Sequence, residues 1–100
     1  MITPYHYIWF HHIAEKRNLN CSARALYFYL ADKCAWSNGD NVHLTQEAMA
    51  SALHVSKSTV NSSLKKLQEA RLISGTKGHY TIMQPDNDWI QRYYLPNIYR

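Results

Sequence analysis

Hydrophobic side chains recur at helical spacing in the first third of the chain, where the pattern predicts two helices. Pro4 suits the first turn of the first helix. Apolar and aromatic positions then follow the i, i+3, i+4, i+7, i+8 spacing of one helical face. We expect this face to pack inward, and Tyr7 and Phe10, which lie off it, to add aromatic surface elsewhere. The predicted inward stripe consists of Tyr5, Ile8, Trp9, His12 and Ile13.

The second predicted helix is apolar over much of its circumference. Asn20 or Ser22 can cap its start. Phe28 and Tyr29 add apolar surface beside its main stripe, and such a helix is usually central to the core. The main stripe consists of Ala23, Leu26, Tyr27, Leu30, Ala31 and Cys34.

Residues 45–70 predict two shorter helices joined by a tight turn. The hydroxyl of Thr45 can cap the first of them, and the hydroxyl of Ser56 can cap the second. His54 and Val55 make the turn between them. The expected inward positions are Met49, Ala50 and Leu53 in the first helix, and Val60, Leu64 and Leu67 in the second.

A hairpin and a tail complete the pattern. Residues 72–76 and 79–83 read as strands on either side of Lys77-Gly78, where the glycine can take the positive φ of a tight hairpin. Val42-His43-Leu44 is long enough for a short strand that could pair with this hairpin. Asp86 can cap a last short helix, which carries Trp89, Ile90, Tyr93 and Tyr94.

These elements predict a mainly α fold with a small β-hairpin, arranged as a winged helix-turn-helix with extra N- and C-terminal helices. The chain has 100 residues, of which 46% are hydrophobic, so one domain with its own core is expected. We divide this single domain, 1–100, into N-terminal helices (1–41), the helix-turn-helix plus wing (42–83) and a C-terminal helix or tail (84–100).

Positive charge is concentrated in residues 45–83. The formal net charge of the chain is +4, and this segment holds five Lys or Arg residues against two Glu residues. A basic patch confined to one unit is typical of nucleic-acid binding. On charge alone, a solvated basic surface is an equally good interpretation.

The outer face of the helix after Ser56 is polar and cationic. A helix that enters the major groove of DNA needs such a face free of core contacts. Asn61 can offer a paired donor and acceptor to adenine, lysines at either end suit phosphates, and the wing could touch the neighbouring groove. The candidate DNA-binding residues are Thr45, Gln46, Ser56, Lys57, Ser58, Thr59, Asn61, Ser62, Lys65, Lys66, Lys77 and His79.

The residue order from Gln46 to Val60, with the hairpin from Leu72 to Met83, resembles the winged-helix superfamily of bacterial DNA-binding proteins. The likeness covers about residues 42–83 and implies sequence-specific binding of double-stranded DNA. The chain departs from the family at His54, where glycine is most common because the position tends to be left-handed. Histidine tolerates that conformation better than most side chains.

Weaker likenesses involve the flanks. Ser22–Leu30, ending at Ala35-Trp36, is similar to the helix before the motif in phage replisome-organiser proteins. Tyr80–Pro85 followed by Trp89 is similar to the wing exit of small plasmid replication and maintenance proteins. These likenesses imply a regulator of transcription or replication of a plasmid or phage, acting by occupancy of a DNA site. Neither likeness decides between the two processes.

The leading alternative is a winged helix that docks another protein, with an incidental basic patch. Six histidines invite a metal site, but adjacent His11 and His12 point about 100° apart on a helix. The remaining histidines are interpreted as scattered. Eight tyrosines raise the possibility of a nicking enzyme that attaches DNA to tyrosine, but such an enzyme usually needs a metal held by paired histidines, so it is not expected. We expect no catalytic residue, no metal and no cofactor. The histidines interpreted as scattered are His6, His43, His54 and His79.

Aromatic surface on the first helix and in residues 89–95 predicts a homodimer joined by terminal helices. A tail that packs over the first two helices is the alternative. His12 is expected to be a packed or interface histidine. Cys21 and Cys34 are predicted on one helix, too far apart to pair, and free thiols suit a reducing cytosol. Without a signal peptide or a long apolar run, we expect a cytoplasmic protein without membrane contact.

Overall fold

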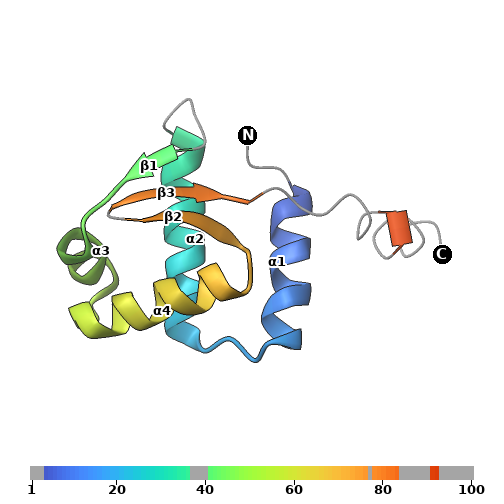
Figure 1. The fold of residues 1–100 in the computed structure, drawn as a ribbon, viewed down its shortest axis with the longest axis horizontal. Helices are drawn as coiled ribbons and strands as arrows, with labels where there is room; N and C mark the ends of the chain where they lie inside the picture. The colour runs from blue at the N-terminus through green and yellow to red at the C-terminus, as the bar shows by residue number, and fades with distance from the viewer. Residues whose placement is uncertain (1–3, 37–40, 77, 84–90, 93–100) are drawn as a thin grey trace.

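Two antiparallel helices, α1 (Pro4–Lys16) and α2 (Cys21–Trp36), open the computed structural model, which describes residues 4–36, 41–76, 78–83 and 91–92 (Figure 1). The predicted winged helix-turn-helix follows them, so the mainly α fold class is confirmed. Of the last helix, predicted to begin near Asp86, only residues 91–92 are among the described residues. The elements after α2 are β1 (Asn41–His43), α3 (Gln46–Leu53), α4 (Lys57–Glu69), β2 (Ile73–Thr76) and β3 (His79–Ile82).

The three strands form one antiparallel sheet in the order β1-β3-β2. The short strand predicted before α3 therefore does pair with the hairpin, one residue earlier than expected. Gly78 has a φ of 89°, as the tight hairpin requires, whereas Lys77 lies outside the described residues. Along β3, Tyr80 and Ile82 are buried and His79 is exposed, so only one face of the sheet meets the core.

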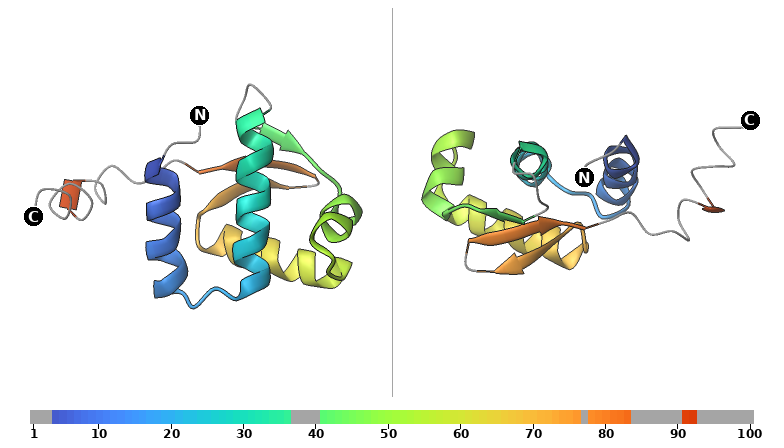
Figure 2. Two further views of the ribbon diagram at one scale, coloured as in Figure 1. Left: turned by 180° about the vertical axis from the view of Figure 1, so that it is seen from behind. Right: turned by 90° about the horizontal axis from the view of Figure 1, so that it is seen from above.

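Helix α2 is the central element, as its broad apolar stripe predicts. It packs against α3, α4, β1 and β3. Seen from above, α1 and α2 lie on the same side of the sheet (Figure 2). Asn20 caps α2, because its Oδ1 accepts a hydrogen bond from the Ala23 N–H at 2.9 Å. Every residue of the predicted α2 stripe is buried.

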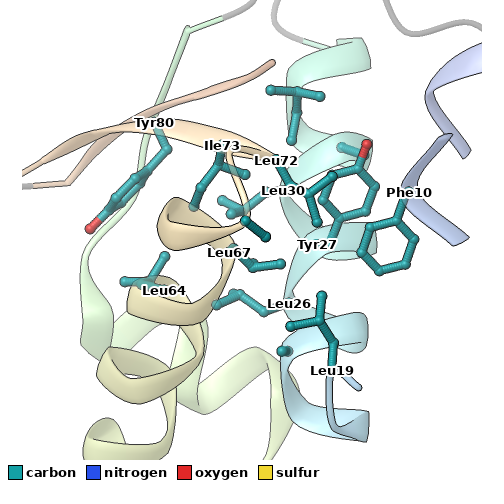
Figure 3. Close-up of a cluster of buried hydrophobic side chains, with 14 of the residues drawn as sticks. Phe10, Leu19, Leu26, Tyr27, Leu30, Leu64, Leu67, Leu72, Ile73 and Tyr80 are labelled. Carbon is teal, nitrogen blue, oxygen red and sulfur yellow. The ribbon is translucent and has the colours of Figure 1, made fainter. Parts of the chain in front are cut away.

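Helix α4 is attached to α2 through a shared cluster of aliphatic side chains (Figure 3). Leu64 and Leu67 of α4 lie in this cluster with Leu26 and Leu30 of α2, each at most 3% exposed. Full burial of each such side chain contributes about 1.5–3 kcal/mol. The inner face of α4 is thereby held in place, and its opposite face is left outside.

The inward face of α1 differs from the prediction. Phe10 is fully buried, whereas Ile8 is 42% exposed and His12 is exposed. The predictions that Ile8 and His12 pack inward and that Phe10 adds surface are therefore wrong. Because apolar and aromatic residues surround this helix, spacing alone could not choose its face. The choice is made by α2, whose Tyr27 ring stacks on Phe10.

Candidate nucleic-acid interface

The turn between α3 and α4 is defined by two hydroxyl caps and one left-handed residue. Thr45 Oγ1 accepts from the Ala48 N–H at 3.0 Å, and Ser56 Oγ accepts from the Thr59 N–H at 3.1 Å. His54 has φ 56° and ψ 44°, the left-handed conformation expected from its position in the motif. Each cap typically stabilises a helix by about 1 kcal/mol. Both predicted caps are confirmed, and they fix where α3 and α4 begin.

The outer face of α4 is free of core contacts, as predicted. Val60, Leu64 and Leu67 are at most 3% exposed, and Ser63 is buried beside them. Thr59 is half-buried. The exposed candidates on this helix are Lys57, Ser58, Asn61, Ser62, Lys65 and Lys66.

Side chains of α3 contact two exposed residues of the candidate α4 face, Lys57 and Asn61. Lys57 Nζ donates to Glu47 Oε1 at 2.6 Å, and Gln46 Nε2 lies 3.4 Å from Asn61 Oδ1. The hydrogen bond from Lys57 lowers the pKa of the Glu47 carboxyl. Sequence reasoning missed Glu47 as a site residue. Glu47 lies on α3 and Lys57 lies on α4, so no spacing within one helix relates them. The turn between the two helices brings their side chains together.

A histidine pair at the wing was also missed. His43 on β1 and His79 on β3 are register partners, both are exposed, and their ring centroids lie 4.4 Å apart. The interpretation of these two histidines as scattered is therefore wrong, because strand pairing joins positions that are distant in sequence. Among the residues that the structure describes, no group of three or more His, Cys, Asp or Glu side chains could hold a metal ion.

The wing and the starts of α3 and α4 meet around a shallow depression of about 320 Å³. Figure 1 shows the end of β2, the start of β3, α3 and the first turn of α4 at the same end of the molecule. The structure thus brings the N-terminal part of the candidate surface next to the wing, while Lys65 and Lys66 lie further along α4. The depression is lined by His43, Leu44, Thr45, Gln46, Glu47, Lys57, Gly78 and Tyr80.

Both cysteines lie on α2, as predicted, and they are not joined in a disulfide; Cys21 is exposed and Cys34 is buried. Within the described ranges, no helix has both the length and the hydrophobicity needed to cross a membrane.

An exposed polar helix, a capped turn before it and an antiparallel wing beside it define a winged-helix domain of the DNA-binding class. The model of the Crp-like helix-turn-helix domain matches residues 23–87, from α2 through the wing, and the chain belongs to this family. DNA is therefore the partner of the domain, and regulation of transcription is its general role. No curated protein and no solved structure matches the chain.

Proposed function

We propose that this chain binds double-stranded DNA sequence-specifically and regulates transcription or replication of a plasmid or phage by occupying its site. The observation that carries the proposal is the division of α4 into a buried aliphatic face and an exposed polar, cationic face. The major groove of B-DNA is about 12 Å wide and admits such a helix. The plasmid or phage setting rests on the likeness of the flanking segments to phage and plasmid proteins.

The candidate residues have different proposed roles. Lys65 and Lys66, exposed in the second half of α4, contact phosphates and set the register of the protein on the duplex. Asn61 faces a base edge in the groove, and Lys57, a phosphate contact in the prediction from the sequence, lies one turn before it on the same side of α4. The remaining contacts come from hydroxyl and amide groups around the two helix starts and from the wing. These are Thr45, Gln46, Ser56, Ser58, Thr59, Ser62, Lys77 and His79.

A mobility-shift assay with a salt titration tests this function. Release of counterions from about five phosphate contacts predicts that affinity falls roughly 10²–10³-fold between about 50 and 200 mM salt. A fragment that contains the operator should be retained at higher salt than a scrambled duplex of equal length. A flat salt response, or no shift with any fragment, would contradict DNA binding and favour a winged helix that docks another protein.

We also propose a homodimer joined by the terminal helices. Ile8 is 42% exposed and Phe28 is 37% exposed, and the half-buried Tyr7 ring stacks on Phe28 with centroids 5.8 Å apart. This aromatic surface on α1 and α2 is available to a second copy. A dimer would place two α4 helices about 34 Å apart, one turn of DNA.

Light scattering of the purified chain tests the dimer. A particle of twice the 11.7 kDa chain mass at tens of micromolar is expected. A particle of the chain mass would contradict it and favour a monomer in which the tail covers the first two helices. The aromatic and aliphatic residues at 89–90 and 93–95 that the dimer proposal also uses lie outside the described residues.

A cytoplasmic location belongs to the same proposal. Cys21 and Cys34 are not joined in a disulfide, which suits a reducing compartment, and DNA, the proposed partner, is found in the cytoplasm of a bacterial cell. Fractionation of cells that express the full chain should recover it with the soluble and nucleoid fractions. Recovery with membranes or outside the cell would contradict this location.

A further inference from the structure

An acidic side chain stands inside the proposed DNA-binding surface. Glu47, in the first turn of α3, lines the depression at the wing and accepts a hydrogen bond from Lys57 at 2.6 Å. The two side chains are 67% and 60% exposed, so the ion pair is open to solvent. The Glu47 carboxyl is negatively charged at neutral pH, as an ordinary glutamate is, and the hydrogen bond from Lys57 lowers its pKa further.

The neighbouring contact places the pair beside Asn61, the candidate base-reading residue. Gln46, next to Glu47 on α3, lies 3.4 Å from Asn61 through its side-chain amide. Asn61 follows Lys57 by one turn of α4 and so shares its side of the helix. The carboxylate therefore lies beside the part of α4 that would enter the groove, away from the distal phosphate contacts.

The position of Glu47 has an electrostatic consequence for DNA binding. A phosphate that approaches the Lys57 ammonium also meets the Glu47 carboxylate beside it, and the two negative charges repel each other. DNA that offers only phosphates is therefore bound less tightly. In the major groove, cytosine N4 is a hydrogen-bond donor that a glutamate can accept, while guanine O6 and N7 accept from a lysine.

We propose that Glu47 is a specificity-determining residue, whose carboxylate weakens binding to non-cognate DNA and is compensated where the groove presents a cytosine amino group. The inference rests on the proposed function and names a base class for that same site. Lys57 and Glu47 then act as a donor and an acceptor held side by side. Such a pair matches a G·C base pair, in which guanine O6 and N7 accept hydrogen bonds and cytosine N4 donates one.

The test compares Glu47→Gln with Glu69→Gln, a matched control. Glu69 is an exposed acid at the far end of α4, so the change in net charge is the same and the position differs. Exposed ion pairs contribute little to stability, so both variants should fold, which thermal melting checks. The probes are a duplex selected by the wild-type protein from a random pool and a scrambled duplex of equal length.

For Glu47→Gln, we expect tighter binding to the scrambled duplex, with a salt slope steeper by about one unit. Binding to the selected duplex should weaken or stay unchanged. The specificity ratio, which is the affinity for the selected duplex divided by that for the scrambled duplex, therefore falls by about tenfold or more. Selection repeated with this variant should lose a C·G preference at one position. The Glu69→Gln ratio should stay within about twofold of wild type.

Two failures are distinguishable. A wild-type protein that shows no salt-dependent shift with any duplex contradicts the proposed function itself. A wild-type protein that binds, with a Glu47→Gln variant whose specificity ratio matches that of Glu69→Gln, overturns only the role of Glu47. An equal change of affinity for both duplexes on Glu47→Gln also overturns it.

Discussion

The ring of Phe10 on α1 lies flat against the ring of Tyr27 on α2, with centroids 4.0 Å apart and planes inclined by 6°. Both side chains are fully buried. The Tyr27 hydroxyl has no hydrogen-bond partner among the described residues. The stack therefore attaches α1 to the central helix, and it also keeps the Tyr27 hydroxyl oxygen away from water.

Tyr27→Phe should stabilise the protein. A buried hydroxyl without a partner retains its desolvation cost, so its removal is expected to raise the free energy of unfolding by about 1 kcal/mol. Urea unfolding measures the change. Tyr29→Phe is the control, because Tyr29 is only half-buried and should show no gain. A loss of stability in Tyr27→Phe would show that the hydroxyl has a partner and that this account of the core is wrong.

Stability should also fall in alkaline solution through Tyr27. Burial, with smaller contributions from Tyr7 and Cys34, raises the pKa of the Tyr27 hydroxyl above its ordinary value of 10.0. As pH rises, the unfolded chain therefore loses this proton before the folded protein does. The free energy of unfolding is unaffected by this ionisation below about pH 10, and it falls as pH rises above that value. Melting temperatures between about pH 8 and 11 should decline less steeply for Tyr27→Phe than for wild type. Identical slopes would contradict the assignment.

His54→Gly should stabilise the turn between α3 and α4. His54 adopts φ 56°, a conformation that costs an L-residue about 1–2 kcal/mol and costs glycine little. After the greater entropy of glycine in the unfolded chain is subtracted, a gain of about 0.5–1 kcal/mol in the free energy of unfolding is expected. His54→Ala keeps a Cβ and should show no gain. If alanine stabilised as much as glycine, backbone strain at this position would not be the cause.

Local chemistry explains why so much of this fold is predictable from the sequence. Caps at Thr45 and Ser56, the left-handed His54 and the buried stripe of α2 depend on residues within a turn or two of one another. Long-range relationships behave differently. The choice of Phe10 as the buried α1 residue depends on which helix it meets, and no period within α1 contains that information.

The candidate DNA-binding surface shows the same difference between local features and long-range contacts. The exposed face of α4 follows from its own apolar positions and was predicted correctly. The Glu47–Lys57 pair joins two helices, and the His43–His79 pair joins two strands, so both exist only after the chain has folded. Spacing rules for a single helix or strand could not find either of them.

Gly75→Ala should disrupt the wing. Gly75 has φ 114° in β2, and a Cβ built there would lie 1.9 Å from the His79 carbonyl oxygen. Because the clash is with backbone, the strands must shift, and strained backbone of this kind typically costs about 1–3 kcal/mol. The free energy of unfolding measures the loss. Ser74→Ala, at an exposed neighbouring position, should change it by less than about 0.5 kcal/mol. Equal effects of both changes would contradict the steric argument.

Lys65→Ala and Asn61→Ala should affect DNA binding in different ways. Loss of a phosphate contact at Lys65 weakens binding to all sequences alike and reduces the salt slope by about one unit. Loss of Asn61 removes a base contact, so discrimination should decline by about 1–3 kcal/mol at one base pair with little change in slope. Salt titrations on the selected duplex and its single-base variants measure both. Indistinguishable behaviour of the two variants would contradict these roles.

Amide chemical-shift mapping on addition of a duplex selected by the protein tests the DNA-binding role of the outer face of α4 most directly. The largest changes are expected at the start of α3, along α4 from Ser56 to Lys66, and at Gly78 and His79 of the wing. The exposed side of α1 around Ile8 should change little. Changes centred on α1 and α2, with α4 unaffected at saturating duplex, would contradict the account.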